Sequence, residues 1–252
     1  MSGRAVCSAL KTVAKPCRVI VSLSYSDYTR DEMEITSLSA QQRDPGRINV
    51  FINGRYTFSL TLAQVVDFDV KVGRQLSEEE LEDLEQEGQF GKVYARALEY
   101  CMMRPRSAKE VRDYLYRKTR TTLSRSKRTG EVYERQGIGV PLSERVYDKL
   151  VDKKYINDIT FTSFWIEHRH RVKGVSHRKL EAELRAKGVD LSIIHEALLG
   201  SDRDDHDELR KVLAKKRARY QDPQKLMQYL ARQGFRYDDI KEALNVDSHS
   251  DY

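Results

Sequence analysis

The sequence lacks the marks of a secreted, membrane-spanning or zinc-stabilised protein. Its 252 residues hold three cysteines, an odd number without paired spacing, so we expect neither a disulfide framework nor a zinc site at Cys7, Cys17 and Cys101. No run approaches the roughly eighteen apolar residues of a membrane span. The first residues also lack a basic stretch followed by an apolar signal-peptide core. We therefore expect an unprocessed, soluble protein of the reducing cytoplasm.

Motifs of the common enzyme classes are also missing. The chain has no P-loop, no dinucleotide-binding glycine fingerprint and no nucleophile elbow. His168 and His170 stand two residues apart, on different faces of a helix, whereas a helical zinc motif places its histidines four apart. We therefore expect no cofactor and no catalysis. An enzyme would need a site built from residues that show no recognised pattern.

Charge is abundant and its balance is basic. Lys and Arg number 45 against 39 Asp and Glu, which gives a formal charge of +6 and a pI of about 9.1. Such a balance favours acidic or polyanionic partners over membranes. The 39% hydrophobic content permits a packed core, and the length exceeds that of a usual single domain. We expect a small N-terminal unit followed by an array.

The strongest pattern is an internal repeat. A shift of 46 residues carries six residues onto identical ones: Leu180, Leu184, Gly188, Ile194, Ala197 and Leu198 onto Leu226, Leu230, Gly234, Ile240, Ala243 and Leu244. A shift of 69 aligns an earlier copy, in which Ser107, Val111 and Leu115 match Ser176, Leu180 and Leu184. The sequence therefore predicts a mainly α protein with three tandem three-helix repeats in an elongated curved array. The alternative is one compact helical bundle with accidental self-similarity.

Capping residues set the limits of the expected helices. The middle copy should hold helices at about 158–172, 176–187 and 190–199, with Ser176 as N-cap and Gly188 as the C′ residue. In the last copy, Asp222 is the N-cap and Pro223 takes the first helical position. In the first copy, Ser107 and Glu110 have capping-box spacing.

The aromatic residues of the middle copy are spaced for one helix face. Phe161, Phe164 and Trp165 should pack against the second and third helices of their repeat, although Trp165 is alternatively an anchor for a partner.

A small β unit should precede the array. Residues 48–52 and 55–60 flank Asn53-Gly54, which predicts a hairpin with a type I′ turn and Phe51 opposite Tyr56. A helix with a capping box at Ser77 follows, and its acidic face is either solvated or docks a basic partner. Residues 88–91, with two glycines, should end this unit. The expected division is a largely disordered 1–46, the hairpin and acidic helix at 47–88, and repeats at 92–157, 158–200 and 201–247.

The first copy contains an insertion. Its Val146 and Leu150 precede Ile194 and Leu198 by 48 residues, not 69, so 21 extra residues fall within about 119–142. In or beside it stand seven cations against Glu131 and Glu134: Arg117, Lys118, Arg120, Arg125, Lys127, Arg128 and Arg135. Threonine and serine hydroxyls among them can reach phosphate oxygens. We predict a flexible basic arm; the alternative is a disordered loop that only keeps the protein soluble.

A second basic feature follows from the alignment. Arg104, Lys173 and Arg219 are equivalent, each three residues before the cap of its second helix. They form either a ladder along one face or separate compensations of helix dipoles. Nearby cations extend the candidate binding residues: Arg106, Arg169, Arg171, Arg178, Lys215, Lys216 and Arg217.

These residues carry a family resemblance. One stretch resembles the first repeat of RecX proteins: Ala97-Leu98-Glu99-Tyr100 through Arg104-Pro105-Arg106-Ser107, then Glu110, Val111, Arg112 and Leu115. The segments 150–158 (LVDKKYIND) and 173–189 are similar to the passages that follow in that family, and 47–86 resembles the N-terminal extension of some members. The resemblance covers about 92–245. The basic insertion departs from the family pattern, so no role is carried over to it.

The resemblance implies a regulator without enzymatic activity. RecX proteins bind the filament that the RecA recombinase forms on DNA, lie along its helical groove, and suppress ATP hydrolysis and strand exchange. The implied partners are the RecA filament and the single- or double-stranded DNA within it, bound by a monomer. The alternative is a helical-repeat module that binds nucleic acid independently of RecA.

Overall fold

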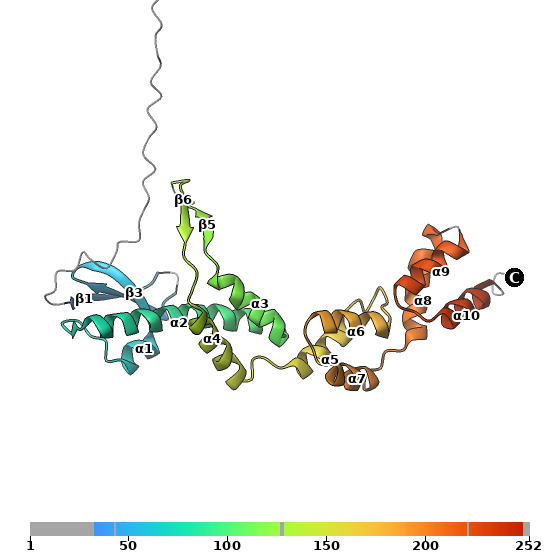
Figure 1. The fold of residues 1–252 in the computed structure, drawn as a ribbon, viewed down its shortest axis with the longest axis horizontal. Helices are drawn as coiled ribbons and strands as arrows, with labels where there is room; N and C mark the ends of the chain where they lie inside the picture. The colour runs from blue at the N-terminus through green and yellow to red at the C-terminus, as the bar shows by residue number, and fades with distance from the viewer. Residues whose placement is uncertain (1–32, 43, 127–128, 221, 249–252) are drawn as a thin grey trace, which may run out of the picture.

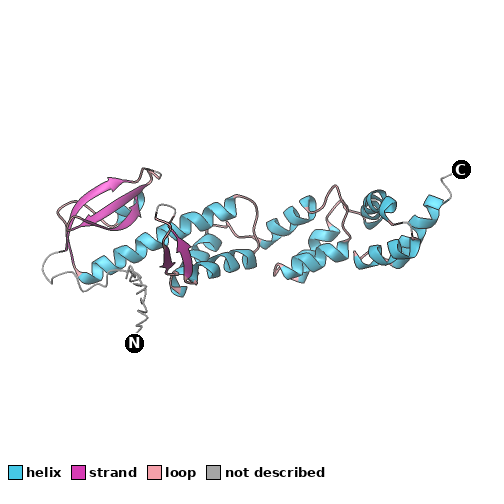
Figure 2. Ribbon diagram, turned by 90° about the horizontal axis from the view of Figure 1, so that it is seen from above, coloured by secondary structure: helices cyan, strands magenta, loops and turns pink. Residues whose placement is uncertain are grey.

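The computed structural model describes residues 33–42, 44–126, 129–220 and 222–248. A small β unit lies at one end, and three helical repeats follow it in chain order along a shallow arc (Figure 1). The view from above shows the same elongated body (Figure 2). The predicted fold class, a mainly α array of three repeats with a small N-terminal β unit, is confirmed.

The N-terminal unit is a sheet covered by a helix. Its described strands are β1 (Met33–Ala40), β2 (Arg47–Ile52), β3 (Arg55–Thr61) and β4 (Gln75–Leu76), all antiparallel in the order β3-β2-β1-β4. A short helix, α1 (Leu62–Asp67), follows β3. The hairpin prediction is confirmed, because Asn53 and Gly54 have φ of +49° and +78° and Phe51 pairs with Tyr56.

The predicted disorder of residues 1–46 is wrong for their last part. Strand β1 pairs with both β2 and β4, and its Ile35 is fully buried in the core of the unit. Most other β1 residues are exposed and polar, so the strand carries little hydrophobic pattern of its own. Hydrogen bonds to β2 and β4 hold β1 as a strand, although its own sequence does not predict one. Residues 1–32, with Cys7 and Cys17, lie outside the described residues.

The acidic helix does not end at the glycines. Helix α2 (Glu78–Met102) begins with the predicted Ser77 and Glu80 capping box but runs through Gly88 and Gly91 into the first repeat. The boundary predicted at 88–91 is therefore wrong. One continuous helix joins the β unit to the array.

Close packing explains the glycines. A Cβ on Gly88 would lie 2.8 Å from the carbonyl oxygen of Ser59 in β3. The buried Arg47 guanidinium donates to this Ser59 oxygen at 2.7 Å and to the Gly88 carbonyl at 3.2 Å. Gly88 thus lets α2 approach the sheet closely, and Arg47 ties the two backbones together.

Each repeat supplies three helices and its own hydrophobic core. Repeat 1 uses the end of α2 with α3 (Ala108–Thr119) and α4 (Val140–Asp152). Repeat 2 comprises α5 (Asp158–His168), α6 (His177–Ala186) and α7 (Leu191–Leu199). Repeat 3 comprises α8 (Asp205–Lys216), the short 3-10 helix η2 (Arg217–Arg219), α9 (Pro223–Arg232) and α10 (Tyr237–Ser248). The predicted caps Ser107, Ser176 and Asp222 are confirmed.

The first helix of repeat 2 is shorter than predicted. Helix α5 ends at His168, and the chain then turns through His170 and Gly174, both with positive φ. A Cβ on Gly174 would lie 2.4 Å from the carbonyl oxygen of Glu208 in α8. The turn is therefore packed against the next repeat, which stops the helix four residues early. The aromatic prediction holds for Phe161 and Trp165, which join the core of repeat 2.

The insertion forms a β-ribbon. Strands β5 (Thr122–Arg125) and β6 (Val132–Arg135) pair in antiparallel register, and the ribbon stands away from the helices between α3 and α4 (Figure 1). Neither the flexible arm nor the disordered loop describes this segment. Lys127 and Arg128 lie outside the described residues.

The two glycines of α2 give a matched test. We expect Gly88→Ala to lower the free energy of unfolding by about 1–3 kcal/mol, because its Cβ meets rigid backbone, although alanine is favoured in helices by about 1 kcal/mol. Gly91→Ala should cost less, since its Cβ meets the end of the flexible Gln64 side chain. Urea unfolding followed by circular dichroism measures both. A Gly88→Ala protein as stable as wild type would contradict the packing argument.

Candidate functional site

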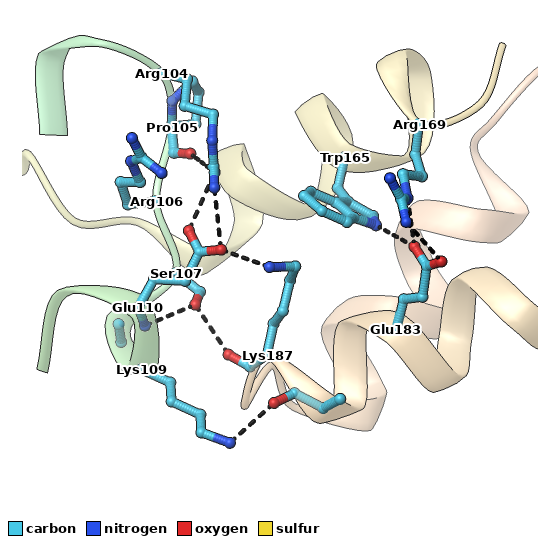
Figure 3. Close-up of polar contacts among 12 residues, drawn as sticks. Arg104, Pro105, Arg106, Ser107, Lys109, Glu110, Trp165, Arg169, Glu183 and Lys187 are labelled. Carbon is cyan, nitrogen blue, oxygen red and sulfur yellow. Dashed lines mark hydrogen bonds and ion pairs between the residues drawn. The ribbon is translucent and has the colours of Figure 1, made fainter. Parts of the chain in front are cut away.

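One serine joins repeat 1 to repeat 2. The buried Ser107 hydroxyl accepts the backbone N–H of Glu110 at 3.1 Å and so caps α3. The same hydroxyl donates to the carbonyl of Lys187 at 2.9 Å, just beyond the end of α6 (Figure 3). Beside it, the N–H of Ala108 donates to the carboxylate of Asp158, at the start of α5, at 2.8 Å. The junction thus satisfies backbone groups at two helix ends, the start of α3 and the end of α6.

The junction between repeats 2 and 3 repeats this arrangement. Ser176 caps α6 and donates to the carbonyl of Gln233 at 2.7 Å, while the N–H of His177 donates to Asp205 at 2.8 Å. Gly188 and Gly234 lie against these contacts with positive φ, where a Cβ would come within 2.9 Å of Lys109 and 2.6 Å of Ser176 respectively. Each glycine is required by both its turn and its neighbour.

One carboxylate, bound by two cations, completes the contacts of the first junction. The Glu110 side chain does not accept a hydrogen bond from the backbone N–H of Ser107, so only one of the two hydrogen bonds of the predicted capping box forms. Its carboxylate instead binds the Arg104 guanidinium at 3.1 Å and the ammonium of Lys187 (Figure 3). Burial raises the pKa of Glu110, but the hydrogen bonds from Arg104 and Lys187 outweigh burial and lower the pKa below its ordinary value. Arg104 is thus part of the junction.

Two further candidate arginines also make internal contacts. Arg169 donates to both oxygens of Glu183, at 2.7 and 3.0 Å, and Trp165 donates to the same carboxylate (Figure 3). Arg106 lies over the Tyr100 ring at 3.8 Å from its centroid and donates to the Tyr100 carbonyl. These contacts lie within repeat 2 and repeat 1 respectively, and they leave less of each arginine side chain free to bind a partner.

The alignment-equivalent cations therefore have different surroundings. Arg104 is paired, whereas Lys173 and Arg219 are exposed. Arg178 on α6 is also exposed, and Arg171 lines a groove that contains several carboxylates, among them Asp202 and Asp207. Whether Lys173 and Arg219 act together stays a prediction.

Four lysines line a groove between repeats 2 and 3. Lys173 comes from the turn after α5, Lys179 from α6, and Lys215 and Lys216 from the end of α8. We call the groove lined by these four lysines the lysine groove; its volume is about 450 Å³. No carboxylate lines it, and none of the described residues forms an ion pair with these lysines. Burial and the charge of Arg169 lower the pKa of the adjoining His170.

A second group of cations surrounds the base of the ribbon. They line a cavity of about 150 Å³ and come from α2, α3, the turn after α3, and β6. We call them the ribbon-foot cluster: Arg96, Arg117, Lys118, Arg120 and Arg135. Again no carboxylate lines the cavity, and no described residue forms an ion pair with a member. Arg125 lies farther out on β5 and is exposed.

Sequence reasoning missed Arg96 and Lys179. Arg96 lies in the middle of α2, one cation among many, and only the packing of α3 on α2 brings it to the cluster. Lys179 had a weak signal, because it aligns with Glu110 at the shift of 69 residues and so marks a reversal of charge at a junction. No local pattern separates either from a solvated surface cation.

Four domain models of one protein family match the chain, from the β unit to the last repeat. The RecX N-terminal domain matches residues 33–77, and the first, second and third RecX three-helix domains match 94–119, 157–198 and 204–244. The chain belongs to the RecX family of regulatory proteins. The first RecX three-helix match ends at Thr119, the last residue of α3, immediately before the ribbon.

Similar proteins and a solved structure agree with this family. The chain is 30% identical over 217 residues to the regulatory protein RecX of Bacillus licheniformis, which covers 83% of this chain and 76% of the relative. It is 29% identical over 218 residues to RecX of Bacillus subtilis, with 84% and 76% covered. A crystal structure of regulatory protein RecX has a TM-score of 0.58 at 22% identity and covers 83% of this chain and 97% of the other, so it shares the fold.

The described residues contain neither a membrane-spanning helix nor a cluster of metal-binding side chains. No helix there has the length and apolar character needed to cross a bilayer. Nor do histidine, cysteine and acidic side chains gather there in a group of three or more that could hold a metal ion.

Each junction serine both caps its own helix and donates to the next repeat, so its loss should destabilise the fold more than the loss of an ordinary cap. We expect Ser107→Ala or Ser176→Ala to lower the free energy of unfolding by about 2–3 kcal/mol, because each removes a helix cap and also leaves a partly buried carbonyl without its donor. Asp190→Ala, which removes only the cap of α7, should cost about 1 kcal/mol. Chemical unfolding compares the three. Equal losses would show that the bridge to the next repeat adds nothing.

The lowered pKa of Glu110 predicts a pH dependence. A depressed carboxyl pKa stabilises the fold above the unfolded value near 4.5, and this contribution is lost as the pH falls through the lower folded value. Glu110→Gln should therefore be less stable than wild type at neutral pH, and the gap should narrow below about pH 4.5. Thermal unfolding from about pH 7 to about pH 3 measures it. A gap independent of pH would contradict the assignment.

Proposed function

We propose that this protein binds the filament that the RecA recombinase forms on DNA and inhibits its ATP hydrolysis and strand exchange. Membership of the RecX family supports a role in RecA regulation. The observation that carries the proposal is the lysine groove, a basic groove without carboxylates at the junction of two repeats. The protein acts by binding, without chemistry of its own.

The charge of the lysine groove favours a polyanionic partner. Four ammonium groups from three segments converge there, and their neighbours are neutral: Lys179 contacts the amide of Gln233, Lys215 a backbone carbonyl, and Lys216 the ring of Tyr229. Like charges held together repel, and an anion that binds among them relieves the repulsion. DNA phosphates or acidic side chains of a protein partner supply such anions.

The shape of the array suits a filament. The repeats succeed one another along a shallow arc, so basic surfaces at the ribbon and at the lysine groove lie at separate positions along one elongated body (Figures 1 and 2). A body of this kind contacts successive parts of a helical groove, and several weak contacts along it add up to stable binding.

Charge removal at the lysine groove tests the proposal. We expect wild-type protein to inhibit the DNA-dependent ATPase and strand exchange of RecA, and Lys173→Ala/Lys215→Ala/Lys216→Ala to need about tenfold more protein for the same inhibition, equivalent to about 1.4 kcal/mol. The control is Arg55→Ala/Arg236→Ala/Lys241→Ala, which removes three exposed cations elsewhere. Thermal unfolding verifies that both variants are folded.

The alternative function gives a different result. A module that binds nucleic acid without acting on RecA would bind single strands with an affinity that falls steeply with salt. It would leave RecA ATPase and strand exchange unchanged at stoichiometric ratios. That pair of results would contradict the proposed function.

A further inference from the structure

The base of the ribbon is a built site with fixed geometry. After β6 the chain returns to α3, where the N–H of Ile138 donates to the Lys118 carbonyl at 3.0 Å. Gly137 lies so close to the Thr119 carbonyl that a Cβ would come within 1.9 Å of that oxygen. Both ends of the ribbon are therefore held at the C-terminal end of α3. This fixes Arg120, which precedes β5, and Arg135, which ends β6, on either side of the cavity.

The ribbon-foot cluster concentrates charge that the described residues do not neutralise. Lys118 is half-buried, and burial, followed by the charges of Arg96, Arg135 and Arg117, lowers the pKa of its ammonium group. Beneath it, the ring of Tyr114 stacks on Tyr100 at 4.4 Å between centroids, and the Lys118 ammonium lies 4.9 Å from the centroid of Tyr114. The cations are therefore supported from below by rings, not by acids.

One face of the ribbon continues this surface outward. Thr122 pairs with Arg135 and Ser124 with Tyr133, and cross-strand partners share a face of the ribbon. Thr122 and Arg135 line the cavity, so Ser124 and Tyr133 extend the same face away from it. The Tyr133 side chain is 46% exposed. From the cavity outward, the face thus presents Arg135 beside Thr122, and then Tyr133 beside Ser124.

We propose that the ribbon-foot cluster and this face bind single-stranded DNA, with a backbone phosphate in the cavity and a neighbouring base stacked on Tyr133. Guanidinium groups and hydroxyls are matched to phosphate oxygens, and an exposed ring accepts a base of any sequence. The cavity of about 150 Å³ admits a phosphate group but not a base pair. An acidic protein surface would use the cations but would leave the aromatic ring without a role.

The site deepens the proposed function, on which its place in a filament rests, because it names a DNA contact in the first repeat. Binding to free single strands does not depend on RecA. The two proposals can therefore fail separately.

Salt titration of DNA binding tests the cluster. Full-length protein is titrated into a labelled oligothymidylate of about 20 nucleotides, and fluorescence anisotropy is measured at several salt concentrations. We expect Lys118→Ala/Arg120→Ala/Arg135→Ala to raise the dissociation constant about tenfold and to reduce the salt slope by about 2, since each phosphate contact on a single strand contributes about 0.7. The control Arg55→Ala/Arg236→Ala/Lys241→Ala changes the net charge equally and should leave the slope unchanged.

Substitution of Tyr133 tests the stacked base. Tyr133→Ala should weaken binding about fivefold or more, whereas Tyr133→Phe, which keeps the ring, should bind as wild type does. The side chain is exposed, so neither change disturbs a core. Equal weakening by both substitutions would assign the contact to the hydroxyl and overturn the stacking.

Other outcomes separate the remaining possibilities. Failure of wild-type protein to bind the oligonucleotide at low salt overturns the site, as does equal weakening by the control variant. A cluster variant that binds DNA normally but no longer inhibits RecA would show that the cations meet an acidic protein surface, which also overturns it. Loss of DNA binding by the cluster variant, together with no effect of wild type on RecA, would support the site and contradict the proposed function.

Discussion

The serine hydroxyl between successive repeats is the contact on which the array depends. Ser107 and Ser176 each accept from the helix they cap and donate to the end of a helix in the next repeat. A hydroxyl can do both at once, whereas an ionised carboxylate can only accept. Asp222, at the equivalent position of repeat 3, caps its own helix and has no hydrogen to donate across a junction. The spacing of the repeats, and so of the surfaces between them, follows from this bridge.

The same scaffold carries different charges at its two junctions. Across the first, the Glu110 carboxylate binds both Lys187 and Arg104 and so offsets part of their positive charge. Across the second, the equivalent positions hold Lys179 and Gln233, so a neutral amide contacts the ammonium and its charge remains. The backbone contacts are alike in both, but the first junction has a carboxylate between its cations, whereas the second opens into the lysine groove, which no carboxylate lines. Substitution of a few side chains thus turns an ion-paired contact into a basic groove without a change in the fold.

Local and periodic features could be predicted from the sequence, and features that depend on distant partners could not. The caps at Ser107 and Ser176 depend on residues three positions away, and the repeat on apolar spacing, so both were predicted correctly. Strand β1 needs β2 and β4, and the passage of α2 through Gly88 needs the carbonyl of Ser59. The β-ribbon could not be predicted, because its charged composition is typical of a loop, whereas pairing between its two strands decides its structure. Among site residues, Arg96 enters its cluster only through helix packing.

Equivalence in a repeat does not make cations equivalent in function. Arg104, Lys173 and Arg219 occupy one position of the repeat, and six residues farther on stand Glu110, Lys179 and Lys225. In repeat 1 that second position is an acid, so Arg104 forms an ion pair with it and serves the junction. In repeat 2 it is Lys179, which lines the same groove as Lys173, and no carboxylate lines that groove. The sign of the second residue therefore separates the ion-paired Arg104 at the first junction from Lys173 in the lysine groove at the second, and that sign is readable from the aligned repeats alone.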